Sequence, residues 1–216
     1  QVCIVGGGLA GLCTALGLVE RGVTDVVVLD SERVGFGASG RNGGFVFGGY
    51  SLDNADLLRT LGRDEGRRLY RLTVDAVDLI HARIARYGID CDIVDQRFAF
   101  DYYRPLKDTR ILWGGRISVL DRGPDAIARL LRRDLLRVYP QLEGVKVDYA
   151  WGGLMSYARH KMPQIGRDAD GVWHAIAFGG HGMAPTTVAG ETLAAALAEG
   201  RPVPDGFAAF GLTRTF

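Results

Sequence analysis

The chain opens with Val2-Cys3-Ile4-Val5-Gly6-Gly7-Gly8-Leu9-Ala10-Gly11, an apolar run that passes into glycines at the spacing Gly6-x-Gly8-x-x-Gly11. This pattern predicts a β-strand that runs into a dinucleotide-binding turn. The first glycine permits the tight turn, the second lets backbone N–H groups approach a pyrophosphate, and the third lets the following helix pack on the strand. The pyrophosphate would then lie at the positive end of that helix.

The residues that follow supply the context that such a turn requires. Residues 12–21 carry apolar side chains at helical spacing, Gly22 ends the helix, and residues 26–29 form a second buried strand. That strand is followed by Asp30, close to the offset of about 20 at which a carboxylate meets a ribose hydroxyl. We expect Asp30 to bind ribose, and its charge argues against a 2′-phosphate. The alternatives are a glycine loop in an ordinary α/β protein and a surface acid that ends a strand.

Length and composition limit the possible classes of protein. A chain of 216 residues, 47% hydrophobic and 24% charged, can bury a core in one or two domains. A net charge of +1 gives no reason to expect nucleic acid or an anionic membrane as a partner. No window has the roughly 18 apolar residues of a membrane helix, and there is no signal-peptide pattern, so we expect a cytoplasmic protein.

The three cysteines, Cys3, Cys13 and Cys91, have neither disulfide nor metal-site spacing, and we expect no metal. Cys3 and Cys13 lie in apolar patterns, which predicts that both are small buried residues.

A second glycine-rich stretch, SERVGFGASGRNGG, covers residues 31–44. It has no periodicity but is rich in small and hydrogen-bonding residues, so we expect a second loop that contacts the cofactor. Arg41 is a natural counter-charge for a phosphate, and Ser39 and Asn42 are short donors. The alternative is a mobile glycine loop with a solvated arginine.

A third glycine cluster follows a predicted strand near the C-terminus. Residues 172–178 form that strand, Gly179-Gly180-His181-Gly182-Met183 follow it, and an alanine-rich helix is expected over residues 184–198. The loop over residues 159–166 precedes the strand and carries three groups that can be positive, beginning with Arg159.

Together, GGGLAG, the acid after the second strand, GFGASGRNGG and GGHGM resemble the FAD-dependent amine and amino-acid oxidases of the D-amino-acid oxidase superfamily, nearest its gamma-glutamylputrescine oxidase-like branch. The resemblance implies hydride transfer from the C–N bond of an amine or amino acid to FAD, hydrolysis of the resulting imine, and reduction of molecular oxygen to hydrogen peroxide. It also implies that the loop wraps the pyrophosphate, and that the last helix directs its positive end at the flavin.

The resemblance assigns roles to individual residues. Arg159 would hold a substrate carboxylate, and His181 would polarise oxygen or the flavin edge. No cysteine lies beside the expected flavin edge in sequence, so FAD should be bound non-covalently. The implied cofactor-binding residues are Gly6, Gly8, Leu9, Ala10, Gly11, Asp30, Ser31, Ala38, Ser39, Gly40, Arg41, Asn42, Gly43, Gly180, His181, Gly182 and Met183.

The predicted fold class is α/β, a Rossmann-like FAD-binding domain with a reduced antiparallel-sheet substrate layer. The FAD-binding domain would be discontinuous, built from residues 1–94 and 171–216, with its sheet from residues 1–50 and 171–200. Residues 95–170 would be the remnant of a substrate domain. Its expected elements are a hairpin over residues 97–119, a helix over 124–138 and a strand over 146–158.

The resemblance falls into two blocks, residues 1 to about 94 and about 95 to 210. Near Asp92 to Asp95 this chain has no counterpart of a long central segment, which in the family includes part of the substrate domain and a further strand of the FAD domain. A flavin oxidase needs a pocket that excludes water. One alternative is therefore an FAD-binding fragment or scaffold without turnover.

Another alternative is an NAD-dependent dehydrogenase, which would share the first glycines and Asp30 but has no use for GASGRNGG or the GGHGM turn. Four aromatic residues either wall a substrate pocket or belong to a sheet core. They are Tyr102, Tyr103, Trp113 and Trp151.

Overall fold

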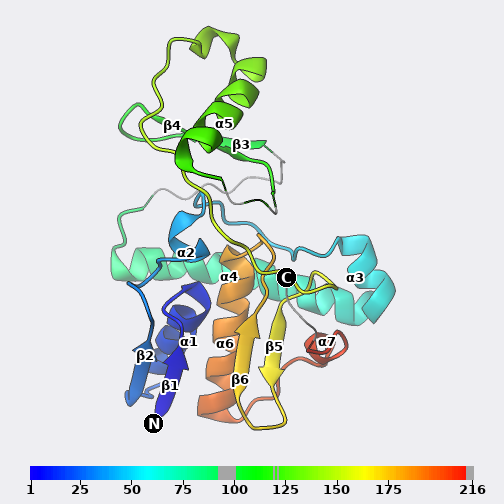
Figure 1. Cartoon of the computed structure of the whole chain (residues 1–216). Helices are drawn as coiled ribbons and strands as arrows, with labels where there is room; N and C mark the ends of the chain where they lie inside the picture. The colour runs from blue at the N-terminus through cyan, green and yellow to red at the C-terminus, as the bar shows by residue number, and fades with distance from the viewer. Residues whose placement is uncertain (92–100, 119, 121, 213–216) are drawn as a thin grey trace.

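The computed structural model describes residues 1–91, 101–118, 120 and 122–212. Its N-terminal unit follows the predicted order of strand, turn, helix and strand. The elements are β1 (Val2–Val5), α1 (Leu9–Glu20) and β2 (Val26–Leu29). The two strands are parallel, with Val2 opposite Val26 and Val5 opposite Leu29 (Figure 1).

Side chains alternate between the two faces of this strand pair. The face that includes Ile4 packs toward α1, because a side chain at Gly11 would lie 3.2 Å from Ile4 Cγ2. The opposite face carries Cys3, Val5 and, on β2, Val27 and Leu29, all exposed. The prediction that Cys3 is buried is therefore wrong, because its position in the alternation turns it away from α1.

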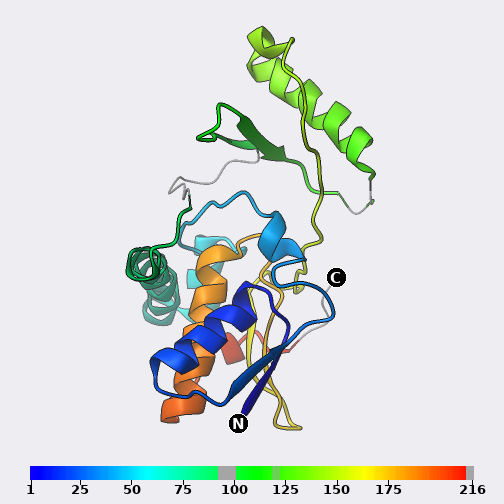
Figure 2. The same ribbon diagram turned by 90° about the vertical axis from the view of Figure 1, so that its left-hand side faces the viewer.

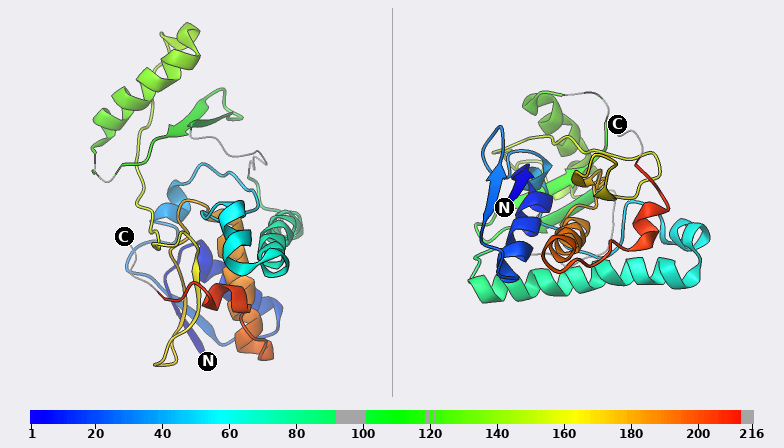
Figure 3. Two further views of the ribbon diagram at one scale, coloured as in Figure 1. Left: turned by 90° about the vertical axis from the view of Figure 1, so that its right-hand side faces the viewer. Right: turned by 90° about the horizontal axis from the view of Figure 1, so that it is seen from below.

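Four more helices surround this unit. They are α3 (Asn54–Leu61), α4 (Arg63–Tyr87), α6 (Met183–Glu199) and α7 (Asp205–Ala208). Their apolar faces meet in a core that includes Leu57 of α3, Leu69 of α4, Val188 of α6 and Phe207 of α7. Seen from below, α4 runs along one side of α1 and α6 (Figure 3).

Helices α1 and α6 lie side by side and run in the same direction (Figures 1 and 2). Their contacts advance together along both helices: Cys13 Sγ lies 3.7 Å from Thr187 Oγ1, and Arg21 Nε donates to Glu199 Oε1 over 2.9 Å. A Cβ atom at Gly190 would lie 2.5 Å from Cys13 Cβ and 2.6 Å from the Cys13 carbonyl carbon, so the helices approach to backbone contact. The N-termini of α1 and α6 therefore lie at the same end of the pair.

A group of charged side chains joins the three longest helices of this body. Arg83 of α4 is only 7% exposed, and its Nη2 donates to Glu20 of α1 and to Glu191 of α6, each over 2.5 Å. Arg21 donates to the other oxygen of Glu191 over 2.9 Å. The Arg83 guanidinium lowers the pKa of the Glu20 carboxyl by donating hydrogen bonds to its charged form.

The C-terminal strands pair with each other and not with β1. Strands β5 (Gln164–Arg167) and β6 (Trp173–Ile176) form an antiparallel hairpin, and in the described part of the chain β1–β2 and β5–β6 are separate two-stranded sheets. The predicted single sheet from residues 1–50 and 171–200 is therefore not formed. A hairpin closes only a short loop, whereas β6 could join β1 only across most of the chain. The hairpin also spans residue 170, where the predicted domains divide.

Four elements between residues 101 and 142 form a lobe that stands apart from this body (Figures 1 and 2). They are β3 (Asp101–Pro105), β4 (Ile111–Gly115), α5 (Pro124–Val138) and the 3₁₀ turn η1 (Pro140–Leu142). The hairpin β3–β4 and α5 confirm their predictions within the described residues, and Arg116 binds Asp134 of α5 through two hydrogen bonds. The part of the predicted hairpin over residues 97–100 lies outside the described residues.

The strand predicted over residues 146–158 is not formed. Residues 145–156 run without a strand ladder, and β-bridges occur only at the end of the predicted range, at Tyr157, which pairs with Phe178, and at Ala158. The alternation of apolar residues there is typical of a strand, but a strand exists only where a partner supplies its hydrogen bonds. Among the described residues, no helix is long and apolar enough to cross a membrane, and no cluster of side chains could hold a metal ion.

Candidate cofactor site

The turn after β1 has the geometry that its glycines predict. Gly6 has a φ of +111°, a conformation that other residues rarely adopt, and its N–H donates to the Leu29 carbonyl of β2 over 2.7 Å. A side chain at Gly11 would overlap the Gly6 carbonyl oxygen. Only glycine at both positions lets α1 begin directly against the end of β1.

Asp30 lies against this turn at the end of β2. Its Oδ2 accepts a 2.6 Å hydrogen bond from the Gly7 N–H, and its Oδ1 accepts one of 2.8 Å from the Glu32 N–H. These backbone donors, with Glu32 contributing most, lower the pKa of the exposed Asp30 carboxyl. The side chain is therefore a charged acceptor at neutral pH, held beside the N-terminus of α1.

The loop over residues 31–44 folds back onto the same turn. The short helix α2 (Ala38–Arg41) brings Ser39 to the start of α1, where its Oγ accepts a 2.8 Å hydrogen bond from the Leu9 N–H. Asn42 holds the loop internally, because its side chain donates to the Ser39 carbonyl over 2.6 Å and accepts from the Gly44 N–H over 2.8 Å. Two glycine-rich stretches separated in sequence thus form one surface around the N-terminus of α1.

Arg41 is tied to two parts of the chain. Its Nε donates to the Phe36 carbonyl over 3.1 Å, and its Nη1 donates to the Gly152 carbonyl over 3.2 Å. In return, Trp151 Nε1 donates to the Arg41 carbonyl over 3.0 Å. Arg41 is nevertheless exposed, and its role toward a phosphate stays a prediction.

The turn before α6 has two glycines, Gly179 and Gly180, with φ angles of +61° and +79°. A side chain at Gly179 would lie 2.9 Å from atoms of Ser51 and Tyr157. His181 packs its ring edge-on against Phe47 at 5.2 Å between ring centroids, and burial lowers the pKa of its imidazole. His181 is therefore predominantly neutral at pH 7.

The structure does not bring Arg159 toward His181. Tyr157 and Phe178 form an antiparallel bridge, so residues that follow Tyr157 run away from residues that follow Phe178. Met155, on the other side of the bridge, lies against Gly180 instead: a side chain at Gly180 would lie 3.1 Å from its sulfur. Arg159 is exposed beyond the bridge.

Sequence reasoning missed the residues that surround the C-terminal turn. They are Phe47, Ser51, Met155 and Tyr157. The short apolar run Phe45-Val46-Phe47 directly after the glycine loop was the available signal for Phe47, because such a run is consistent with a buried extended segment.

The four aromatic residues divide between two environments. Tyr102 packs edge-on against Phe45 at 5.0 Å, and Trp151 binds the Arg41 carbonyl, so both contact the loop region. Tyr103 instead stacks on Trp113 at 5.5 Å, and the two pack against Tyr139 after α5. Tyr103 and Trp113 therefore belong to the packing of the lobe.

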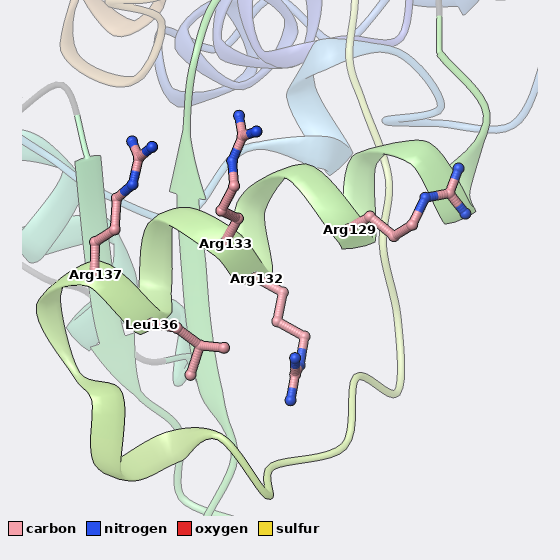
Figure 4. A pocket seen from close by; sticks show the side chains of 5 residues that line it. All are labelled: Arg129, Arg132, Arg133, Leu136 and Arg137. Atoms are coloured by element: carbon pink, nitrogen blue, oxygen red, sulfur yellow. The ribbon is translucent and has the colours of Figure 1, made fainter.

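A cavity of about 430 Å³ lies on α5, and Figure 4 shows the side chains that line it. These are Arg129, Arg132, Arg133, Leu136 and Arg137. Arg132 donates to the Glu143 carbonyl, and Arg137 lies 3.7 Å from Asp134. None of the predicted site residues lines this cavity, so it is separate from the glycine-rich surface.

Comparison with known proteins identifies the family to which this site belongs. The sequence model of the FAD dependent oxidoreductase family (DAO) matches residues 1–100 and 93–196. The gamma-glutamylputrescine oxidoreductase of Escherichia coli (strain K12) is 24% identical over 352 aligned positions, which cover 90% of this chain and 82% of that protein. No solved structure matches the chain.

Two further relatives match a shorter part. Each is described as a probable oxidoreductase OrdL. The one from Haemophilus influenzae is 40% identical over 92 residues, which are 43% of this chain and 21% of the relative. The one from Rhizobium meliloti is 34% identical over 114 residues, which are 53% of this chain and 26% of the relative.

The matches also concern the central segment that the sequence analysis finds missing near residues 92–95. The alignment with the Escherichia coli protein has more positions than the 216 residues of this chain, so a long stretch of that relative has no counterpart here. The two family matches meet at residues 93–100, where the sequence places the missing segment. With its glycine turn, its acid after β2 and family matches over most of its length, the chain belongs to the family of FAD-dependent oxidoreductases.

Proposed function

We propose that this protein oxidises the C–N bond of an amine or amino acid, with FAD as the electron acceptor and molecular oxygen reduced to hydrogen peroxide. The family match supports FAD-dependent oxidation, and the name of the Escherichia coli relative points to gamma-glutamylputrescine or a similar amine. The observation that carries the proposal is the joining of both glycine-rich stretches at the N-terminus of α1, through the Leu9–Ser39 and Gly7–Asp30 hydrogen bonds.

The residues present fit the cofactor. The N-terminus of α1 and the short donors of α2 would hold the pyrophosphate, and Asp30 would accept hydrogen bonds from the adenosine ribose. The N-terminus of α6 lies at the same end of the helix pair and would face the flavin ring. FAD, when bound, supplies the two-electron acceptor that protein side chains lack.

We expect FAD to be bound non-covalently, and the positions of Cys3 and Cys13 support this expectation. Cys13 is enclosed between α1 and α6, where burial raises the pKa of its thiol, and Cys3 lies on the outward face of β1. Neither position is at the first residues of α1 or α6. Acid precipitation should therefore release the yellow colour into the supernatant, and a yellow pellet would contradict this part of the proposal.

His181 and Arg159 are the proposed reactive-site residues. The neutral imidazole of His181, beside the turn that precedes α6, would polarise oxygen or the flavin edge. Arg159 is exposed and would bind a substrate carboxylate. It lies on the side of the Tyr157–Phe178 bridge that is away from His181. The division into a discontinuous FAD-binding domain over 1–94 and 171–216 and a substrate layer over 95–170 belongs to the same proposal.

A second candidate function is FAD binding without turnover. The observation that favours it is the segment 145–156, which forms no strand and whose apolar side chains face solvent where a substrate layer would enclose a pocket. An NAD-dependent dehydrogenase explains neither the loop on α1 nor the family match.

The test separates these candidates in one preparation. The purified protein is saturated with FAD, its absorption spectrum is recorded, and gamma-glutamylputrescine or an amino acid is added without oxygen. Bleaching of the flavin, followed by peroxide release in air, is the expected result. Bound flavin that no amine bleaches would establish binding without turnover. Binding of NADH without any bound flavin would overturn the cofactor assignment itself.

A further inference from the structure

The cavity on α5 has a size and a lining that suit a small charged ligand. Its volume of about 430 Å³ lies within the range of about 300–1,000 Å³ that is usual for small-molecule sites. At 3.6 residues per turn, its lining residues fall within a sector of about 140° around the helix. This arginine groove consists of Arg129, Arg132, Arg133, Leu136 and Arg137.

Guanidinium groups flank the groove on both sides. In Figure 4 Arg133 and Arg137 extend from one side of α5, and Arg132 and Leu136 extend from the other. Arg129, Arg133 and Arg137 follow one another at intervals of four residues, which is about 6 Å along the helix axis. A ligand in the groove would therefore meet positive charge at several points along its length.

Two of these arginines have no partner within the described part of the chain. Arg129 and Arg133 form no hydrogen bond or ion pair with a described residue. Asp125 lies one turn before Arg129 on the same helix, but the two form no ion pair, and Asp125 does not line the groove.

The other two arginines are only partly compensated. Arg137 lies 3.7 Å from Asp134, but this carboxylate already accepts two hydrogen bonds from Arg116. Arg132 donates to the carbonyl of Glu143, which carries no charge. The groove therefore has an excess of positive charge.

The exposed face of α4 shows a different arrangement of charge. There Arg68 donates to Glu65 and Arg71 donates to Asp75, each about one turn away. Such pairs stabilise a helix, whereas like charges four residues apart destabilise it. On α5, Arg133 has an arginine both four residues before it and four residues after it. A face that met only water would be more stable with the arrangement of α4, so this row favours an external anion as the counter-charge.

The lining also indicates the chemistry of the ligand. The planar fork of a guanidinium binds a carboxylate or a phosphate through two parallel hydrogen bonds. Arginines one turn apart can each hold one acidic group, and Leu136 offers an apolar contact to the atoms between them. Neither an acidic nor an aromatic side chain lines the groove, so it favours neither a cation nor a stacked base.

We propose that the arginine groove of α5 binds a small polyanion, a molecule with at least two carboxylate or phosphate groups joined by a short spacer. This goes beyond the proposed oxidation and does not depend on it, because none of the residues proposed to bind FAD lines the groove. Arg133, at the centre of the row, makes the main contact.

The test is calorimetric titration of the purified protein, loaded with FAD and freed of excess cofactor. The two probes are tricarballylate, an aliphatic tricarboxylate, and tripolyphosphate. At least one should bind as one molecule per chain with a Kd below about 1 mM, and the tighter of the two identifies the acidic group. Acetate and inorganic phosphate should bind at least about tenfold more weakly at equal ionic strength, because each offers one acidic group. Added salt should weaken binding, because it screens exposed charges.

A matched pair of variants locates the site. Arg133→Gln should weaken binding of the better probe by at least about tenfold, because it removes the central charged donor. Arg67→Gln removes an exposed arginine of α4 and should bind as the unmodified chain does. Both side chains are exposed, and glutamine is nearly as good a helix former as arginine, so neither change should affect folding.

Three results would overturn the proposal. One is the absence of saturable binding by either probe. Another is equal affinity in Arg133→Gln and Arg67→Gln, which would show a general attraction of anions to the surface. The third is binding that Arg41→Gln abolishes and Arg133→Gln does not, which would place the anion at the glycine-rich surface.

Discussion

Gly190→Ala tests whether the close approach of α1 and α6 is a requirement of the fold. The added Cβ would lie 2.5 Å from Cys13 Cβ, 2.6 Å from the Cys13 carbonyl carbon and 2.8 Å from the Thr14 nitrogen. Ordinary contacts begin at 3.4 Å, and two of these three atoms belong to backbone that cannot rotate away. Helix α6 must therefore withdraw from α1 by on the order of 1 Å, which forfeits a quarter to a half of the dispersion energy along the contact.

The expected magnitude combines two opposing effects. Overpacking of this kind costs about 1–3 kcal/mol, whereas alanine is favoured over glycine in a helix by about 1 kcal/mol. Because the overlap at Gly190 is with backbone atoms, the cost should lie in the upper part of that range, about 2–3 kcal/mol, which leaves a net loss of about 1–2 kcal/mol in the free energy of unfolding. For a chain of this length, that corresponds to a fall of roughly 2–8 °C in Tm.

The control is Gly17→Ala in the same interface. Its Cβ would lie 2.9 Å from Ala194 Cβ and 3.0 Å from Glu191 Oε1, which are side-chain atoms. The overlap is smaller than at Gly190 and involves no backbone atom, and the gain in helix propensity offsets part of its cost, so Gly17→Ala should lose less stability than Gly190→Ala. Urea and thermal unfolding of the two variants and the unmodified chain measure the difference. A Gly190→Ala protein as stable as the unmodified chain would refute the backbone contact inferred between the two helices.

Two further predictions concern charge. Asp30→Ala and Arg41→Ala should each raise the Kd for FAD roughly ten- to hundredfold in a titration of stripped apoprotein, with Arg71→Ala on the exposed face of α4 as the unchanged control. Equal affinity in all three would show that the glycine-rich turn does not hold the cofactor. The Arg83 guanidinium lowers the pKa of Glu20 below its ordinary value of 4.5, so this pair stabilises the fold above that pH, and the contribution is lost as the pH falls through the lowered pKa. Glu20→Gln should therefore be less stable at pH 7, and the difference should shrink in acid; a urea-unfolding difference that stays constant from pH 7 to about 3 would contradict this.

The elements that could be predicted from the sequence depend on neighbours along the chain. Asp53 accepts the Ala55 N–H over 2.8 Å and so begins α3, and Gly88 ends α4 in a left-handed conformation. The turn at Gly6 and the acid after β2 follow from spacing in the same way. Such features need no knowledge of distant contacts.

Strand pairing could not be predicted in this way. The alternation over residues 146–158 is that of a strand, but no residue near it in sequence decides whether a partner exists. Similarly, nothing in the sequence of β6 distinguishes pairing with β5 from a place beside β1. Residues 146–158 therefore keep the apolar pattern of a strand, although most of them form no strand because no partner strand lies beside them.

The sequence also predicts part of the candidate site, namely the residues that lie close to the glycine-rich turn along the chain. Ser39 and Asp30 were identified by type and position, and the structure places both at the N-terminus of α1. The sequence suggests Arg159 because it begins a loop with three groups that can be positive, but the antiparallel bridge at Tyr157 directs it away from His181. The direction in which the chain continues after Tyr157 depends on its pairing with Phe178, and this distant contact cannot be predicted from one sequence.

The parallel arrangement of α1 and α6 links the amount of folded protein to the supply of its cofactor. Each helix N-terminus carries about half a positive charge; the Asp30 carboxylate lies beside that of α1, whereas α6 has no acidic residue in its first turn. The positive potential that remains at this shared end favours a bound dianionic pyrophosphate. A ligand present at a hundred times its Kd adds about 2.7 kcal/mol to the free energy of unfolding. Folding and flavin binding are therefore thermodynamically linked, and the protein without its cofactor would unfold more readily than the loaded protein.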